Sequence, residues 1–154
     1  MSDFIVSCGS TADLSEEIAN NRNIAVLPFC FRVGETDYAD DFGKSISNEE
    51  FYKLTSGGAK VKTSQIPSGR YVEFFEPFLK DGKDVLHVTL SSGLSGTYES
   101  CLSAKRELEE KYPERKVYVT DSLCGSMGYG MIVLKAADYR DEGRSAAEIA
   151  ALLE

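Results

Sequence analysis

A run of small polar residues interrupts the chain between an apolar stretch and an amphipathic one. The run is Ser91-Ser92-Gly93-Leu94-Ser95-Gly96-Thr97, and residues 84–90 before it have the composition of a buried strand. Hydroxyl and backbone N–H groups donate hydrogen bonds without carrying charge, and glycine lets the backbone approach a ligand closely. Where such a loop opens a helix, the helix directs its N–H groups and positive end at an anion. The pattern is typical of a carboxylate or phosphate site.

Two further loops have the same character. Gly9-Ser10-Thr11 follows a short strand pattern, and the small residues of 121–126 follow another. Ligands of parallel sheets bind outside the carboxyl ends of the strands, so we expect all three loops at one edge. The three loops contain no Lys, Arg or His, and Asp121 is their only carboxylate. This composition favours reversible binding of an acidic group over bond-breaking chemistry.

Conventional reactive groups are few. His87 is the only histidine and lies within a strand pattern, where a hydrogen-bonded core histidine is the ordinary interpretation. Cys124 lies in a glycine-rich loop, with no neighbour in sequence that would activate it. The four cysteines form no C-x-x-C pair, and the sequence lacks a phosphate-binding P-loop and a nucleophile elbow. We expect no metal and no cofactor. An enzyme acting on a small phosphorylated or acyl substrate through His87 or Cys124 is the alternative hypothesis.

The first half of the chain predicts short elements. Asp13 with Glu16 forms a capping box, which predicts a helix starting at Asp13. The apolar run 24–33 contains Pro28, so we expect a strand that is broken or lies at a sheet edge. A short β segment at 36–39 and a helix opened by Ser47 follow, and residues 59–67 are expected to form a loop.

The second half alternates more regularly. Ser68 precedes a helical stripe of apolar residues, and residues 84–90 form a strand that is apolar on both faces. Helices over 97–112 and 127–141 flank a strand at 117–120, and Ser145 begins a last helix. Alternating strands and helices with short loops predict an α/β fold, with helices on both sides of a mostly parallel sheet.

Length, composition and charge limit the kind of protein that this chain can be. The 154 residues suffice for one domain with a real core. A net charge of −8 argues against a nucleic-acid surface or an anionic membrane surface. No apolar run approaches the roughly 18–20 residues needed to cross a bilayer, and the N-terminus lacks a signal-like segment, so we expect a cytoplasmic protein. The last helix pattern has no stop signal, which favours one domain of a longer protein.

Four segments together resemble the DegV family of bacterial fatty-acid-binding proteins, some of which present fatty acids to a fatty acid kinase. They are Ser10-Thr11-Ala12-Asp13-Leu14, Thr63-Ser64-Gln65, the block Ser91–Tyr98, and Asp121-Ser122. They occur in the family's order over essentially the whole chain. The block Ser91–Tyr98 is the most specific of the four.

The resemblance implies that residues 1–154 form the family's first domain, a three-layer α/β/α unit, and that its C-terminal domain is absent from this chain. A long-chain fatty acid would be the ligand, bound without catalysis. Its carboxylate would lie between the domains on the hydroxyls of Thr63 and Ser92, with Ser91 as the alternative. The acyl chain would run into an apolar tunnel of the first domain.

Two positions depart from the family pattern. Gly9-Ser10-Thr11 stands where the family usually has Asp-Ser-Thr, and Ile66 separates Thr63-Ser64-Gln65 from Pro67.

The chemistry of a long acyl chain agrees with a neutral head site. Burial of each CH₂ contributes roughly 0.8 kcal/mol, so the tail supplies the affinity and the hydroxyls need only orient the head.

Overall fold

A four-stranded parallel sheet forms the centre of the computed structural model, which describes residues 3–153. Its strand order is β2-β1-β6-β7, and all three pairings are parallel. The strands are β1 (Phe4–Gly9), β2 (Ile24–Leu27), β6 (Asp84–Thr89) and β7 (Val117–Asp121). Every residue of β6 is buried, as expected for a central strand covered on both faces.

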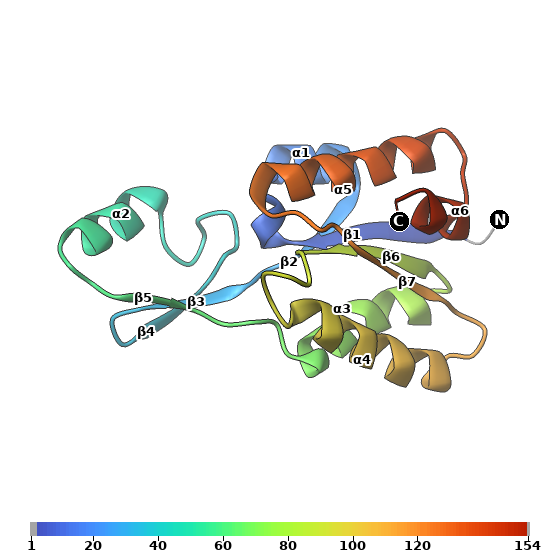
Figure 1. Cartoon of the computed structure of the whole chain (residues 1–154), viewed down its shortest axis with the longest axis horizontal. Helices are drawn as coiled ribbons and strands as arrows, with labels where there is room; N and C mark the ends of the chain where they lie inside the picture. Colours follow the sequence, from blue (N-terminus) through green and yellow to red (C-terminus); the bar gives the residue numbers. More distant parts are fainter. Residues whose placement is uncertain (1–2, 154) are drawn as a thin grey trace.

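Helices cover both faces of this sheet (Figure 1). One layer contains α1 (Glu16–Asn21), α5 (Ser126–Asp141) and α6 (Ala146–Leu153). The opposite layer contains α3 (Ser68–Lys80) and α4 (Thr97–Lys111). The expected three-layer α/β fold is therefore confirmed. Within residues 3–153, no helix combines the length and the apolar character that a membrane span needs.

Alternation along the strands divides the core into two parts. Val6 and Leu86 point toward α5 and α6, whereas Val85 and Val117 point toward α3 and α4. The predicted stripe of α3 packs into the second part through Tyr71, Phe75 and Leu79. Side chains on successive positions of a strand face opposite layers, so each central strand contributes to both.

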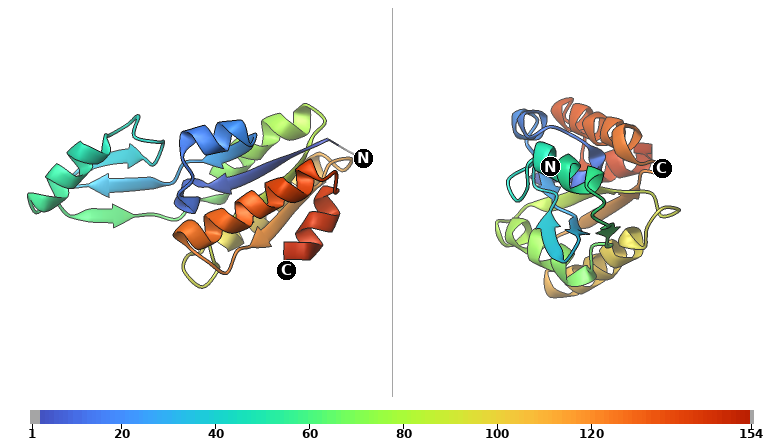
Figure 2. Two further views of the ribbon diagram at one scale, coloured as in Figure 1. Left: turned by 90° about the horizontal axis from the view of Figure 1, so that it is seen from above. Right: turned by 90° about the vertical axis from the view of Figure 1, so that its left-hand side faces the viewer.

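A second sheet projects beyond the carboxyl edge of the first (Figure 1, Figure 2). It is antiparallel, with the order β4-β3-β5, and carries the helix α2 (Asn48–Ser56). Its strands are β3 (Cys30–Val33), β4 (Thr36–Ala39) and β5 (Val61–Thr63). We call residues 29–65, which include these four elements, the protruding unit.

The sequence predicted only parts of this unit. The break at Pro28 and the strand at 36–39 are confirmed, but the two halves of the apolar run 24–33 belong to different sheets. The expected loop over 59–67 was wrong at β5, because Val61–Thr63 pairs with β3. All three β5 residues are exposed, so the segment lacks the apolar pattern that would identify a strand.

The start of α1 was also predicted wrongly. Residues Ser10–Ala12 form a short 3₁₀ helix, and Asp13 then adopts a left-handed conformation with φ of 54°. The helix begins at Glu16, and the hydroxyl of Ser15 caps it by accepting the Ile18 N–H. The carboxylate of Asp13 accepts instead a hydrogen bond from the hydroxyl of Ser126. A local capping pattern thus gave way to a contact 113 positions away in sequence.

Candidate functional site

A cavity of about 550 Å³ lies between the protruding unit and the carboxyl edge of the parallel sheet. This volume falls within the roughly 300–1,000 Å³ of typical small-molecule sites. Apolar and aromatic side chains supply much of its wall: Phe29, Phe31, Ala39, Ile46, Phe51, Tyr52, Val61, Leu90 and Leu94. The site therefore depends on the second sheet, which the sequence predicted only in part.

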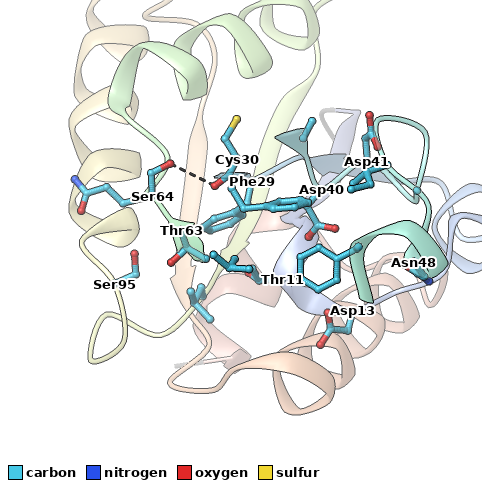
Figure 3. Close-up of a pocket in the computed structure, with 18 of the residues that line it drawn as sticks. Thr11, Asp13, Phe29, Cys30, Asp40, Asp41, Asn48, Thr63, Ser64 and Ser95 are labelled. Atoms are coloured by element: carbon cyan, nitrogen blue, oxygen red, sulfur yellow. Dashed lines mark hydrogen bonds between the residues drawn. The ribbon is translucent and has the colours of Figure 1, made fainter. Parts of the chain in front are cut away.

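Polar groups divide between two sides of the cavity. Figure 3 shows Thr63, Ser64 and Ser95 on one side and Asp13, Asp40 and Asp41 on the other. Hydrogen bonds from the hydroxyl and N–H of Ser45 lower the pKa of Asp41 and favour its charged form. No described residue of the lining is a Lys, Arg or His. One side can thus donate hydrogen bonds, while the other repels an anion.

Ser95 is positioned by a chain of hydrogen bonds. Its Oγ lies 2.8 Å from Thr97 Oγ1 and accepts the Thr97 N–H at 3.2 Å. Thr97 Oγ1 in turn accepts the Ile66 N–H at 3.4 Å. With Thr97 as donor to Ser95, the Ser95 hydroxyl proton is free to donate into the cavity.

Thr63 is positioned by the protruding sheet. It ends β5, opposite Phe31 of β3, and the next residue is anchored because the Ser64 hydroxyl donates to the Cys30 carbonyl at 3.3 Å. The Gln65 side chain packs directly over Gly96, where a Cβ would overlap its Oε1. The loop after β5 is thereby fixed against the loop after β6, and Thr63 and Ser95 line the same cavity.

The other two predicted residues lie outside that lining. Ser91 is buried, and its Oγ accepts the Gly93 N–H at 3.2 Å, so it shapes the turn. Ser92 is exposed, and its N–H donates to both carboxylate oxygens of Asp121, at 3.1 and 3.3 Å. The negative charge of Asp121 beside Ser92 disfavours a second carboxylate there.

The three hydroxyl-rich loops do come together, but not all of them line the cavity. The first contributes Thr11, and the second contributes Ser95. The loop after β7 contacts the second loop, because the Ser91 N–H donates to the Cys124 carbonyl at 3.1 Å, and it reaches the end of the first, because the Ser126 hydroxyl donates to Asp13. Its side chains are not part of the lining, so this loop contacts the other loops without contacting the cavity.

Neither conventional reactive group faces the cavity. His87 is 0% exposed, makes edge contacts with the rings of Tyr71 and Phe75, and has its Nδ1 2.9 Å from Ser7 Oγ. Burial lowers the pKa of His87 to about 3, which favours the neutral imidazole. Cys124 is half-buried and outside the lining. Among residues 3–153, no group of three or more His, Cys, Asp or Glu side chains could hold a metal ion.

Ser95 lies in the run of small polar residues that the sequence predicted as a site, but it was not chosen as a ligand contact. Its spacing from Thr97 fits a local turn equally well, and the hydrogen bonds above show that it does shape one. What distinguishes it is a contact between segments far apart in sequence. The segment after β5 is held by the pairing of β5 with β3 and by the Ile66 N–H, which donates to Thr97 Oγ1 beside Ser95.

Known proteins share both the sequence and the fold. A DegV domain-containing protein of Clostridium perfringens is 34% identical over all 154 residues, which cover 53% of that protein. A solved structure titled as fatty acid binding of a DegV family protein from Thermus thermophilus has a TM-score of 0.85 at 27% identity, over 99% of this chain and 52% of that one. A stearic-acid-binding protein of Eubacterium ventriosum has a TM-score of 0.87 at 25% identity, over 97% and 52%.

The chain spans about half the length of the curated relatives that it matches. The model of the DegV family, described as an uncharacterised protein family, matches residues 5–154. The match covers the parallel sheet, the protruding unit and the cavity between them. The chain belongs to the DegV family.

Proposed function

We propose that this chain binds a long-chain fatty acid in the cavity beneath the protruding unit. The observation that carries the proposal is a cavity with aromatic walls and uncharged hydroxyls on one side. The Thermus and Eubacterium structures, named for fatty acid binding, support the same ligand class. The tail supplies the affinity through burial, and the hydroxyls orient the head.

The fatty acid carboxylate lies on the side of Thr63 and Ser95. Both hydroxyls can donate to it, whereas Asp13, Asp40 and Asp41 repel it from the opposite side. The acyl chain then extends along the aromatic wall. This arrangement needs no buried cation, and it matches a site that must release its ligand.

Ser92 and Ser91 remain candidates from the family resemblance. An Asp121 carboxylate that accepts the Ser92 N–H weighs against Ser92, and the buried turn contact of Ser91 weighs against that residue. Ser95 is therefore the preferred partner of Thr63. Substituting Ser95 and Ser92 separately distinguishes the two assignments.

We further propose that residues 1–154 act as the first of two domains, and that the complete protein presents its fatty acid to a kinase. The half-length matches to the relatives support the first part, and the family resemblance supports the second. A cytoplasmic location and the lack of a cofactor other than the lipid stay predictions. The enzyme alternative would need a route for substrate to the fully buried His87 or to Cys124.

The direct test is binding by the purified chain after delipidation. Native mass spectrometry and isothermal titration with palmitate and oleate should show one bound fatty acid per chain. Hexadecane and hexadecanol are the matched controls for palmitate, the first for the apolar tail and the second for a neutral head. The proposal would be contradicted if neither fatty acid bound. It would also be contradicted if a fatty acid and its alcohol bound equally well, whether Thr63 and Ser95 were altered or intact.

A further inference from the structure

The phenyl ring of Phe29 rests directly on Gly9. A Cβ at position 9 would lie 2.7 Å from Phe29 Cε2 and 3.3 Å from its Cδ2, closer than atoms can approach without a shift. Gly9 ends β1 at the carboxyl edge of the sheet, and Phe29 lines the cavity above it. The ring occupies the space that a side chain at position 9 would take.

The backbone on both sides of this contact is fixed. Phe29 N–H donates to Ser10 Oγ at 3.0 Å, and the Phe29 carbonyl accepts the Asp40 N–H at 2.8 Å. Gly9 N–H donates to the hydroxyl of Tyr129 at 2.8 Å, and that hydroxyl donates to the Val88 carbonyl at 2.6 Å. The ring of Phe29 is therefore the part that can move.

Backbone conformation does not explain the glycine. Gly9 has φ of −86° and ψ of 160°, an extended conformation open to any residue. Besides the ring of Phe29, the nearest atom to a Cβ at this position is the Tyr129 hydroxyl, at an ordinary 3.7 Å. The contact with Phe29 is the one feature of this site that requires the absence of a side chain.

We propose that Phe29, seated on Gly9, sets the size of acyl chain that the cavity accepts. Phe29 is a specificity-determining residue, and Gly9 is a positioning residue that keeps the ring out of the ligand's space. The inference rests on the proposed fatty acid binding and adds its selectivity. An added methyl group at position 9 pushes the ring into the cavity, and loss of the ring enlarges the cavity.

The two substitutions are thus expected to act in opposite directions. Gly9→Ala should shift preference toward shorter chains, and Phe29→Leu or Phe29→Ala toward longer or bulkier ones. Each methylene gained or lost from the buried tail changes the dissociation constant about fourfold. Competition titrations with saturated fatty acids from decanoate to stearate, and with oleate, measure the shift.

The double variant is the sharper measurement. In a Phe29→Ala background no ring remains to be displaced, so Gly9→Ala should no longer change chain-length preference. Gly69→Ala is the matched control, because Gly69 is exposed and a Cβ there meets nothing within 4 Å. Thermal unfolding identifies variants that lose structure, and Phe29→Leu provides a milder change if Phe29→Ala is unstable.

An unchanged chain-length profile for both Gly9→Ala and Phe29→Leu would overturn the inference. The inference would also be overturned if Gly9→Ala changed the chain-length preference by the same amount in the Phe29→Ala background. These failures differ from failure of the proposed function. If the unaltered chain binds no fatty acid, the function is wrong, whereas binding with an unaltered profile refutes only the role of Phe29 and Gly9.

Discussion

The parallel sheet with its helices and the protruding unit differ in how many of their residues are buried. All six residues of β6 are buried, and α3, α4 and α5 each contribute at least three buried residues. In contrast, α2 buries none of its residues and all three residues of β5 are exposed. The core lies around the parallel sheet, with Phe29 of the protruding unit packed at its edge, whereas other aromatic side chains of the protruding unit line a cavity.

This difference separates stability from ligand binding. Burial of apolar surface dominates folding, so the layers around the parallel sheet supply most of the free energy of unfolding. Inside the protruding unit, α2 packs on β3 through aromatic contacts such as Phe31 against Phe51, with ring centroids 5.6 Å apart. Regions with few buried contacts open most easily, and ligand-binding segments are drawn from them.

The largest expected effect tests this separation. Leu86→Ala removes a fully buried side chain of β6 and should lower the free energy of unfolding by about 2–5 kcal/mol. Phe51→Ala in the protruding unit should cost clearly less stability but weaken fatty acid binding, because Phe51 lines the cavity. Urea denaturation and palmitate titration measure the two properties. Equal losses of both in the two variants would show that the regions are not separable.

The buried histidine gives the core its own dependence on pH. His87 has a pKa lowered from 6.5 to about 3 in the folded chain. As pH falls below 6.5, the unfolded chain takes up a proton that the folded chain does not, so stability decreases. This group adds a slope of up to about 1.4 kcal/mol per pH unit between the two pKa values.

The matched variant is His87→Gln, which keeps a hydrogen-bonding group near Ser7 but does not titrate. Its free energy of unfolding, measured by urea titration at a series of pH values, should fall less steeply than that of the unaltered chain below pH 6.5. Parallel curves would mean that His87 titrates normally, and hence that water reaches it.

A smaller effect distinguishes two serines of one loop. Ser95→Ala removes a neutral donor at the cavity and should weaken palmitate binding by about 0.5–1.5 kcal/mol; it should also lower stability, because the Thr97 N–H loses its acceptor. Ser92→Ala should leave binding nearly unchanged, because only its backbone N–H contacts Asp121. The opposite ranking in a binding titration would restore the assignment that the family resemblance implies.

The smallest effect is expected on the outer face of the protruding unit. Arg32 pairs with Asp37 across β3 and β4, and both side chains are exposed. Exposed ion pairs contribute little to stability. Arg32→Ala should therefore leave both thermal unfolding and palmitate binding almost unchanged. A clear loss of binding would show that the hairpin orientation depends on this pair.

The same two regions explain what the sequence could predict. The strand 84–90 is apolar on both faces because its burial is complete, and the helix after it carries a stripe of buried residues, so both were predicted within a residue or two. β5 has neither pattern, and Asp13 exchanged its local capping role for a contact with Ser126. Thr63 could be chosen from a motif, but its alignment with Ser95 depends on sheet pairing that local sequence does not encode.

The most direct test is a crystal structure of the chain with bound palmitate. The account predicts the carboxylate within hydrogen-bonding distance of Thr63 Oγ1 and Ser95 Oγ, with the acyl chain along the wall formed by the protruding unit. A fatty acid bound elsewhere, or one whose carboxylate lies on the side of Asp40 and Asp41, would contradict it.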